Sequence, residues 1–287
     1  MTYHAPEDHR NNNPFRTVFF VPQCGIMEVK MKKGVSKFNF DSKLMLIPSL
    51  LVALLAWQLV SMTSVGVVIV GPAKTFGALI KTINNGSLWT NIWASLERVF
   101  WGFLLGAACA IPLAILLGWY KVFRSIVEPW LQFLRTIPPI ALCPMVIALF
   151  GVGLAAKVAI IFFAVLLVMV ITIYQGVKNV DVTLIKAARV LGATEREIFF
   201  DIIVPASFPF ILVGVRLGLA AALSTLIAAE LTGATYGLGN MIQVAASYFN
   251  MDIVMLGVAV IGTIGFVLDK FVLFLERKLT GWQETIQ

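Results

Sequence analysis

The chain has 287 residues, of which 59% are hydrophobic and 13% are charged, and its mean hydropathy is +0.91. Soluble globular domains are about half apolar and about a quarter charged, so this composition excludes an ordinary soluble domain and predicts that lipid surrounds most of the chain. The net charge of +7 then indicates Lys and Arg held on the cytoplasmic side of a membrane rather than nucleic-acid binding.

Cysteine and histidine are scarce. Cys24, Cys109 and Cys143 show neither metal-ligand nor disulfide spacing, and we expect them to be small buried hydrophobic side chains. The two histidines, His4 and His9, lie in the polar N-terminal segment, so the membrane part has no histidine for catalysis or metal binding. We therefore expect no catalytic residues, metal or cofactor in this chain.

Residues 1–43 are polar and basic, and we predict a disordered cytoplasmic tail. The segment carries seven Lys or Arg residues and a run of three asparagines followed by proline. No long apolar stretch occurs in it, so no signal peptide is expected. Met27 and Met31 precede its most basic part and are candidate alternative translation starts.

Long apolar runs begin at residue 44. A helix needs about 20 apolar residues to cross about 30 Å of hydrocarbon. Six runs satisfy or approach this length: 44–64, 99–119, 137–152, 158–177, 207–231 and 253–275. They predict an all-α membrane domain with six transmembrane helices over 44–275, followed by a cytoplasmic tail at 276–287. Pro112 and Pro144 lie inside two runs, which favours a packed bundle in which neighbouring helices satisfy the freed carbonyl groups.

The distribution of Lys and Arg predicts the orientation. With a cytoplasmic N-terminus, the inside segments 1–43, 120–136, 178–206 and 276–287 hold 16 of these residues. The outside segments hold four, which are Lys74, Lys81, Arg98 and Lys157. Because cytoplasmic loops are enriched in Lys and Arg, both termini are predicted to be cytoplasmic.

Two outer connections and two stripes of small residues have an expected structure. Residues 75–83 are predicted to form a short external helix, and 232–252 a loop or short helix near the outer surface. Small residues recur every fourth position at Gly102, Gly106 and Ala110, and again at Gly214, Gly218 and Ala222. This spacing predicts close helix packing in lipid.

The segment 181–205, DVTLIKAARVLGATEREIFFDIIVP, is the most informative part of the sequence. Asp181 is expected to cap a short helix, and Gly192 to end it in the left-handed conformation. Thr194 and the Glu three residues later form a capping-box pattern that starts a second helix, which Pro205 either breaks or follows as the start of the next. Two short amphipathic helices joined in this way are suited to docking into a groove of another protein.

This segment resembles the cytoplasmic loop of ABC importer permeases, whose pattern is Glu-Ala-Ala, three residues, Gly, nine residues and Ile-x-Leu-Pro. The corresponding residues lie at the same spacings, with Ala193 beside the glycine: Lys186, Ala187, Ala188, Gly192, Ile202 and Pro205. Two positions differ from the pattern, because Lys186 replaces the acidic residue and Val204 replaces Leu. The charge at Lys186 is reversed, so no acidic role is carried over to it.

The resemblance extends from about Ser95 to the C-terminus, where the chain looks like the permease family for taurine, aliphatic sulfonates and nitrate. Residues 224–243 and 276–287 look most like taurine permeases. The resemblance implies a type I importer fold in the inner membrane and a homodimer. It also implies a cytoplasmic ABC ATPase docked at the coupling helix of 181–205 and an extracytoplasmic binding protein that delivers the substrate.

The implied function is uptake of a small sulfonate or a related anion or zwitterion, with taurine first. Nitrate or another small organic solute remains an alternative. ATP and Mg are expected to be used by the partner ATPase, because no Walker sequence occurs and Lys74-Thr75 lacks the glycine that should precede the lysine.

Four residues of the run 207–231 are candidates for the translocation path: Arg216, Ser224, Thr225 and Glu230. Ionisable residues at membrane depth are often functional. The alternative is that Glu230 caps a helix interface and that Arg216 snorkels or pairs with a neighbouring helix. Asp269 is expected to anchor a helix end at the membrane boundary.

Two other classes of membrane protein fit the sequence less well. An ion-coupled secondary transporter often contains inverted repeats and broken helices at the midplane, and no repeat is visible in this sequence. A membrane enzyme would require a motif such as HExxH or GxSxG, or paired carboxylates within the membrane, and the sequence has none of these.

Overall fold

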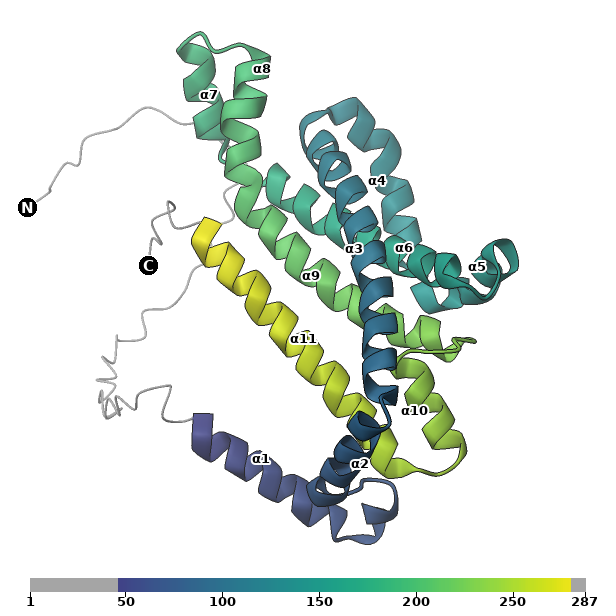
Figure 1. Cartoon of the computed structure of the whole chain (residues 1–287). Helices are drawn as coiled ribbons and strands as arrows, with labels where there is room; N and C mark the ends of the chain where they lie inside the picture. Colours follow the sequence, from purple (N-terminus) through teal and green to yellow (C-terminus); the bar gives the residue numbers. More distant parts are fainter. Residues whose placement is uncertain (1–45, 280–287) are drawn as a thin grey trace, which may run out of the picture. The chain divides into compact units, whose positions relative to one another are not determined.

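The computed structural model describes residues 46–279. The expected tail 1–43 and the candidate starts Met27 and Met31 lie outside this range. Every regular element from residue 46 to residue 279 is helical, and the longest helices are drawn side by side in Figure 1. The predicted all-α class is therefore confirmed.

Four helices are long and apolar enough to cross a membrane in the described part of the chain. They are α3 (Ser87–Trp119), α6 (Leu154–Lys178), a continuous helix over 195–231, and α11 (Met251–Leu279). The continuous helix consists of α8 (Glu195–Glu197), a π-helical segment (Ile198–Ile203) and α9 (Val204–Leu231). At 1.5 Å per residue, each of the four exceeds the ~30 Å of a hydrocarbon core.

The first and third predicted spans differ from the structure. The first, α1 (Leu46–Ser61), has 16 residues and a length of about 24 Å, which is short for an upright crossing. In place of the third, α4 (Lys121–Arg135) and the apolar segment 139–150, which ends in α5 (Cys143–Phe150), form a pair bent by 87°. Pro138 and Pro139 lie at this bend. Proline lacks the amide donor that a helix interior requires, so these residues interrupt the helix.

The described residues thus contain four spans, or five if the bent pair is one span, where the sequence predicted six. A hydropathy window detects an apolar run, but it does not detect a bend in the chain at the polar end of that run. The segment 120–136, expected as a loop, instead forms the amphipathic helix α4. Likewise α11 continues to Leu279, past the boundary predicted at residue 276.

The shorter helices follow the predicted connections. The expected helix at 75–83 is α2 (Pro72–Asn84), and the connection 232–252 contains α10 (Leu238–Ser247). Helix α3 begins at Ser87, 12 residues before the predicted span, so Arg98 lies inside the helix rather than at its start. Lys157, expected in an outer loop, belongs to α6 and is buried. Polar residues at the ends of spans are thus part of the helices.

Helices α3, α6 and α9 pack against one another and form the core (Figure 1). A Cβ atom added to Gly102, Gly106, Gly214 or Gly218 would lie 2.6–2.7 Å from a side chain of α6. Real Cβ atoms do not approach other atoms so closely, so these four positions require glycine for helix contact. The predicted packing role of both small-residue stripes is therefore confirmed.

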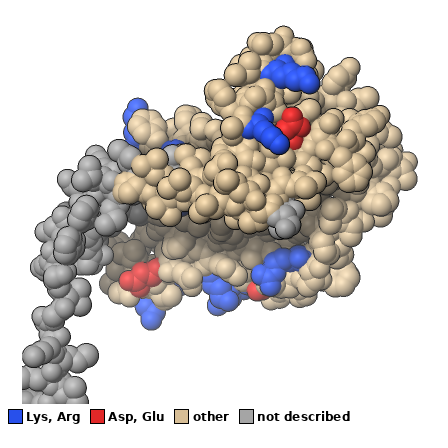
Figure 2. All heavy atoms as spheres, turned by 90° about the horizontal axis from the view of Figure 1, so that it is seen from below, with Lys and Arg blue, Asp and Glu red and all other residues tan. Residues whose placement is uncertain are grey.

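The surface is mostly uncharged. In Figure 2, basic and acidic side chains occupy a few separate places on a largely uncharged face. Many large apolar side chains are exposed, among them Trp93 on α3 and Phe266, Phe271 and Phe274 on α11. A soluble monomer rarely exposes so much apolar area, whereas a helix surrounded by lipid does so without cost.

Candidate functional site

The first candidate feature is the segment 181–205, named the coupling loop after the permease segment that it resembles, at the end of the bundle where α7 (Val182–Val190) and α8 lie (Figure 1). The Asp181 carboxylate accepts a hydrogen bond of 2.8 Å from the Thr183 amide and caps α7. This hydrogen bond lowers the pKa of Asp181 below its ordinary value. Gly192 follows α7 with φ of +86°, the left-handed conformation that favours glycine. Both local predictions are confirmed.

The capping box of the second helix is also present. The Thr194 amide donates to Glu197 Oε2 at 2.6 Å, and the Glu197 amide donates to Thr194 Oγ1 at 3.4 Å. Pro205 lies in the first turn of α9, so it starts the next helix as the second predicted alternative stated. The helix continues through the π-helical segment without a break. The coupling loop is therefore joined directly to the spanning helix α9.

The outer surface of the coupling loop is apolar at its tip. Val190 is 88% exposed and Leu191 is 87% exposed, and Lys186 and Ala187 are exposed as well. On the inner side, Ala188 is buried and Ile202 packs against the core. The motif residues thus divide into a buried set that anchors the loop and an exposed set that is free to contact a partner.

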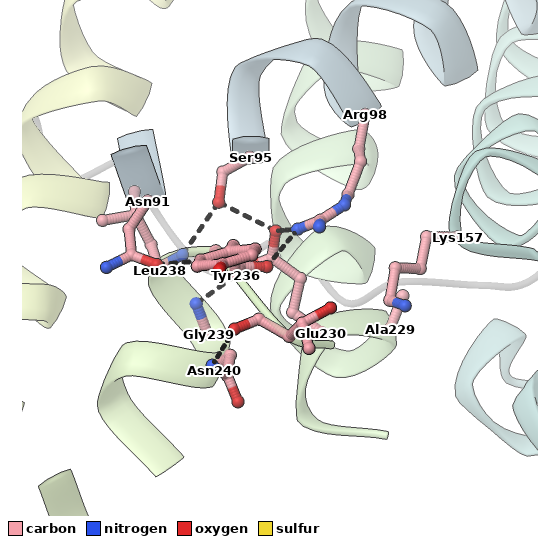
Figure 3. Close-up of polar contacts among 12 residues, drawn as sticks. Asn91, Ser95, Arg98, Lys157, Ala229, Glu230, Tyr236, Leu238, Gly239 and Asn240 are labelled. Carbon is pink, nitrogen blue, oxygen red and sulfur yellow. Dashed lines mark hydrogen bonds and ion pairs between the residues drawn. The ribbon is translucent and has the colours of Figure 1, made fainter. Parts of the chain in front are cut away.

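The second feature is a buried polar network around Glu230 at the opposite end of α9 (Figure 3). Glu230 has no solvent exposure, and its Oε1 atom lies 2.5 Å from Arg98 Nη1 and accepts a hydrogen bond of 2.8 Å from Ser95. Its Oε2 atom accepts a hydrogen bond of 2.7 Å from the Gly239 amide. A fully buried carboxylate requires such partners, so this network holds α3, α9 and the start of α10 together.

The same network fixes the connection between α9 and α10. Arg98 Nη1 donates to the Tyr236 carbonyl at 2.7 Å, and the Leu238 amide donates to Ser95 Oγ at 2.9 Å. The Gly237 amide donates to Asn91 Oδ1 at 2.8 Å. Three residues on successive turns of α3 therefore hold a loop that follows them by about 140 positions.

Lys157 extends the polar region on the side of α6. Its Nζ atom donates to the Val152 carbonyl at 2.5 Å and contacts the Gly233 carbonyl at 3.4 Å. The side chain is buried although an outer loop was expected at this position. Lys157 therefore joins the connection before α6 to the loop after α9.

The third feature is the α9–α11 groove, which contains two of the four candidate path residues. Arg216 and Ser224 line it, and Arg216 Nε lies 2.6 Å from Asp269 Oδ1 on α11. Thr225 and Glu230 are buried on the inner side of α9 and do not reach this groove. Arg216 thus pairs with a residue of a neighbouring helix and also lines the groove, whereas Glu230 lies at a helix interface.

The partners of Glu230 and Arg216 were not predicted from the sequence. Arg98 was placed at the entry of a helix and Asp269 at a membrane boundary, yet Asp269 lies ten residues before the end of α11. An available signal was the presence of opposite charges inside apolar runs, because a charge at membrane depth requires a partner. The sequence does not state which helices become neighbours, so the pairs were not identifiable.

The described residues contain no metal site. Between residues 46 and 279, no group of three or more His, Cys, Asp or Glu side chains is placed to hold an ion. Cys109 and Cys143 are free thiols, and Cys143 is fully buried as predicted, whereas Cys109 is exposed. The coupling loop, the buried network and the groove are therefore the features that bear on function.

The chain belongs to the family described as binding-protein-dependent transport system inner membrane components, whose model matches residues 102–281. An ABC transporter permease protein of Brucella abortus is 46% identical over 228 residues, which cover 79% of this chain and 91% of that protein. The taurine transport system permease protein of Escherichia coli is 36% identical, covering 71% of this chain and 74% of that protein. An aliphatic sulfonates transport permease protein of Bacillus subtilis is 32% identical, covering 93% and 96%.

Solved transporters share the fold. An amino acid ABC transporter matches with a TM-score of 0.60 and 16% identity, covering 70% of this chain and 97% of that one. The methionine ABC transporter in an inward-facing conformation matches with a TM-score of 0.53 and 21% identity, covering 64% and 95%. The protein is thus a multi-pass inner-membrane permease subunit of an ABC importer, with a transport role rather than an enzymatic one.

Proposed function

We propose that this permease imports a small sulfonate or a related anion or zwitterion, with taurine as the first candidate, and that it works as a homodimer. A separate cytoplasmic ATPase docks at the coupling loop and uses ATP and Mg. A binding protein delivers the substrate at the opposite face. Six membrane-spanning segments with both termini in the cytoplasm complete the proposal.

The exposed apolar tip of the coupling loop is the observation that supports ATPase docking. Val190 is the last residue of α7 and Leu191 follows it, at the opposite end of α7 from the Asp181 cap. Apolar side chains at a tip rich in charged residues are stabilised when a partner covers them. The Arg189–Glu195 ion pair of 3.0 Å crosses the turn between the two short helices.

The substrate class is supported by the relatives. A taurine and an aliphatic sulfonates permease protein match over most of their length, at 36% and 32% identity. Identity at this level supports a class of solute and leaves nitrate, or another small organic solute, as the alternative. An ion-coupled transporter is the less favoured candidate, because the family couples to a binding protein.

The test is uptake of radiolabelled taurine into proteoliposomes with the cognate ATPase and binding protein. We expect ATP-dependent uptake by the native permease and its loss in Gly192→Pro, since proline cannot adopt the φ of +86° found there. Gly153→Ala is the control, because Gly153 has φ of −70° and nothing lies within 4 Å of an added Cβ.

Each outcome has a distinct meaning. Uptake in the absence of any ATPase contradicts the coupling proposal. Association with the ATPase without taurine uptake leaves the permease role in place and overturns taurine as the substrate. Equal uptake by the native protein and Gly192→Pro contradicts the role of the coupling loop.

A further inference from the structure

The α9–α11 groove has the size of a small-molecule site, with a volume of about 420 Å³. Ligand pockets in proteins have volumes of roughly 300–1,000 Å³. Arg216, Ala220 and Ser224 line it from α9 at intervals of four residues, so they lie on one face of that helix. Gly265 and Asp269 line it from α11 with the same spacing. The small residues Ala220 and Gly265 leave the space between the polar positions open.

The charged pair in this groove lies within two of the spanning helices. Arg216 is 12 residues from the start of α9 and 15 from its end, or about 18 Å and about 22 Å along the helix. The two side chains are nevertheless 46% and 36% exposed. A charged pair that faces hydrocarbon is costly, and such residues almost always face a bundle interior or a water-filled cavity. The exposure of the pair shows that the described part of this chain leaves both side chains open to a ligand.

The pair offers one positive and one negative group on neighbouring helices. Arg216 Nε lies 2.6 Å from Asp269 Oδ1, and Arg216 Nη2 lies 3.3 Å from Asp269 Oδ2. A solute that carries both charges can bind between the two side chains. Its anionic group takes the place of the carboxylate beside Arg216, and its ammonium group takes the place of the guanidinium beside Asp269. No charge is then left without a partner. A simple anion can replace only the carboxylate, which leaves Asp269 without its guanidinium partner at membrane depth.

We propose that the α9–α11 groove is a substrate site for small zwitterions, in which Arg216 binds the sulfonate or carboxylate and Asp269 binds the ammonium group. The site favours zwitterions over simple anions such as nitrate and over sulfonates that lack an amine. This inference rests on the proposed function and narrows its substrate class. Guanidinium binds oxyanions in two parallel hydrogen bonds, which suits a sulfonate.

The test measures binding of radiolabelled taurine to the permease–ATPase complex in nanodiscs without the binding protein, so that only the permease selects the solute. Ethanesulfonate and nitrate serve as competitors. We expect Asp269→Asn to weaken taurine binding by roughly 10- to 100-fold, the worth of a charge-assisted hydrogen bond, while ethanesulfonate binding is unchanged or stronger. Arg216→Gln is expected to weaken both to a similar extent.

Lys270→Gln is the matched control. Lys270 is adjacent to Asp269 in sequence, and its ammonium lies 5.3 Å from the centre of the Phe266 ring. Its replacement removes the same charge as Arg216→Gln and is expected to change taurine binding by less than about threefold, because a single exposed cation–π contact is weak. The exchanged pair Arg216→Asp with Asp269→Arg retains both charges, and it is expected to bind taurine more tightly than either single variant.

Three results overturn the proposal: no taurine binding by the native complex at 10-fold the concentration that saturates uptake, roughly equal binding of taurine and ethanesulfonate, or native binding by both single variants. The uptake assay separates these failures from failure of the proposed function. Taurine uptake that persists while the variants bind normally removes only this site. Loss of uptake in the native protein removes taurine as the substrate.

Discussion

The Glu230 carboxylate lies 2.5 Å from the Arg98 guanidinium, although 132 residues separate them in the chain. The side chains are 0% and 10% exposed, so the pair is effectively removed from solvent. Its surroundings supply further hydrogen bonds from Ser95 and from the Gly239 amide. The pair is therefore the centre of the contact between α3, α9 and α10.

Removing one member of this pair is expected to destabilise the protein strongly. Arg98→Met leaves Glu230 as a buried charge without its cation, which typically costs about 3–5 kcal/mol. The measurement is thermal unfolding of the purified permease in detergent. We expect a lower midpoint temperature for Arg98→Met, and a partial recovery in the double variant that also carries Glu230→Gln.

Equal stability of Arg98→Met and the native protein would mean that the network contributes little. The double variant distinguishes the loss of a partner from a packing defect, because a packing defect at Arg98 is not relieved by a change at Glu230. A coupling energy of zero between the two positions contradicts a direct interaction.

Close contact between α3 and α6 predicts a steric effect at Gly106. A Cβ atom at this position would lie 2.7 Å from Val165 Cγ1, so Gly106→Val is expected to cost about 1–3 kcal/mol or more. Gly262→Ala on α11 is the control, because nothing lies within 4 Å of an added Cβ there and alanine favours helix. Thermal unfolding of both variants tests the prediction, which fails if they are equally stable.

The apolar tip of the coupling loop predicts a loss of ATPase binding in Val190→Asp. Burial of a Val side chain contributes roughly 1.5–3 kcal/mol, so an added charge in its place is expected to weaken ATPase association by at least 10-fold. Val67→Asp is a matched control, because Val67 is 82% exposed and lies between α1 and α2, far in sequence from the loop. Copurification with the ATPase gives the readout, and an equal loss in both variants would refute a specific interface.

The Asp181 cap predicts a pH-dependent stability of α7. The pKa of Asp181 is lowered by the hydrogen bond from the Thr183 amide, so the ionised form is bound more strongly in the folded loop than in the unfolded one. Its stabilising effect is present above the ordinary carboxyl pKa and is lost as the pH falls through the lowered value. Hydrogen exchange of the α7 amides, corrected for intrinsic rates, is expected to increase over that acidic range.

The variants at this position separate the two contributions. Asp181→Asn retains an acceptor for the Thr183 amide and is expected to remove the pH dependence while keeping α7 protected at neutral pH. Asp181→Ala is expected to increase exchange at all values of pH. Identical exchange profiles in the native protein and Asp181→Ala would show that the cap does not stabilise α7.

Local features were predictable from the sequence, whereas contacts between distant residues were not. The cap at Asp181, the left-handed Gly192 and the capping box at Thr194 depend on interactions within four residues, and all three are present. The packing stripes were also predictable, because glycine at every fourth position has few other uses in a spanning helix. These features place the coupling loop and the core.

The number of complete spans and the partners of the charges inside the spanning helices could not be predicted in this way. The bend of 87° before α5 follows from prolines at 138 and 139, but a hydropathy window averages over them. Arg98, Glu230 and Asp269 each needed a partner, and only the tertiary arrangement identifies it. Because Arg98 was assigned to a helix entry, its place in the network around Glu230 was not predicted.

The unbroken helix over 195–231 has a consequence for how motion spreads through the protein. Arg216 lies 21 residues beyond Glu195 on this single rod, which corresponds to about 32 Å. A tilt of the coupling loop is therefore expected to move the groove through the backbone of this helix, without a chain of side-chain contacts between the two sites. The π-helical segment and Pro209 are two places in this helix where its direction can change.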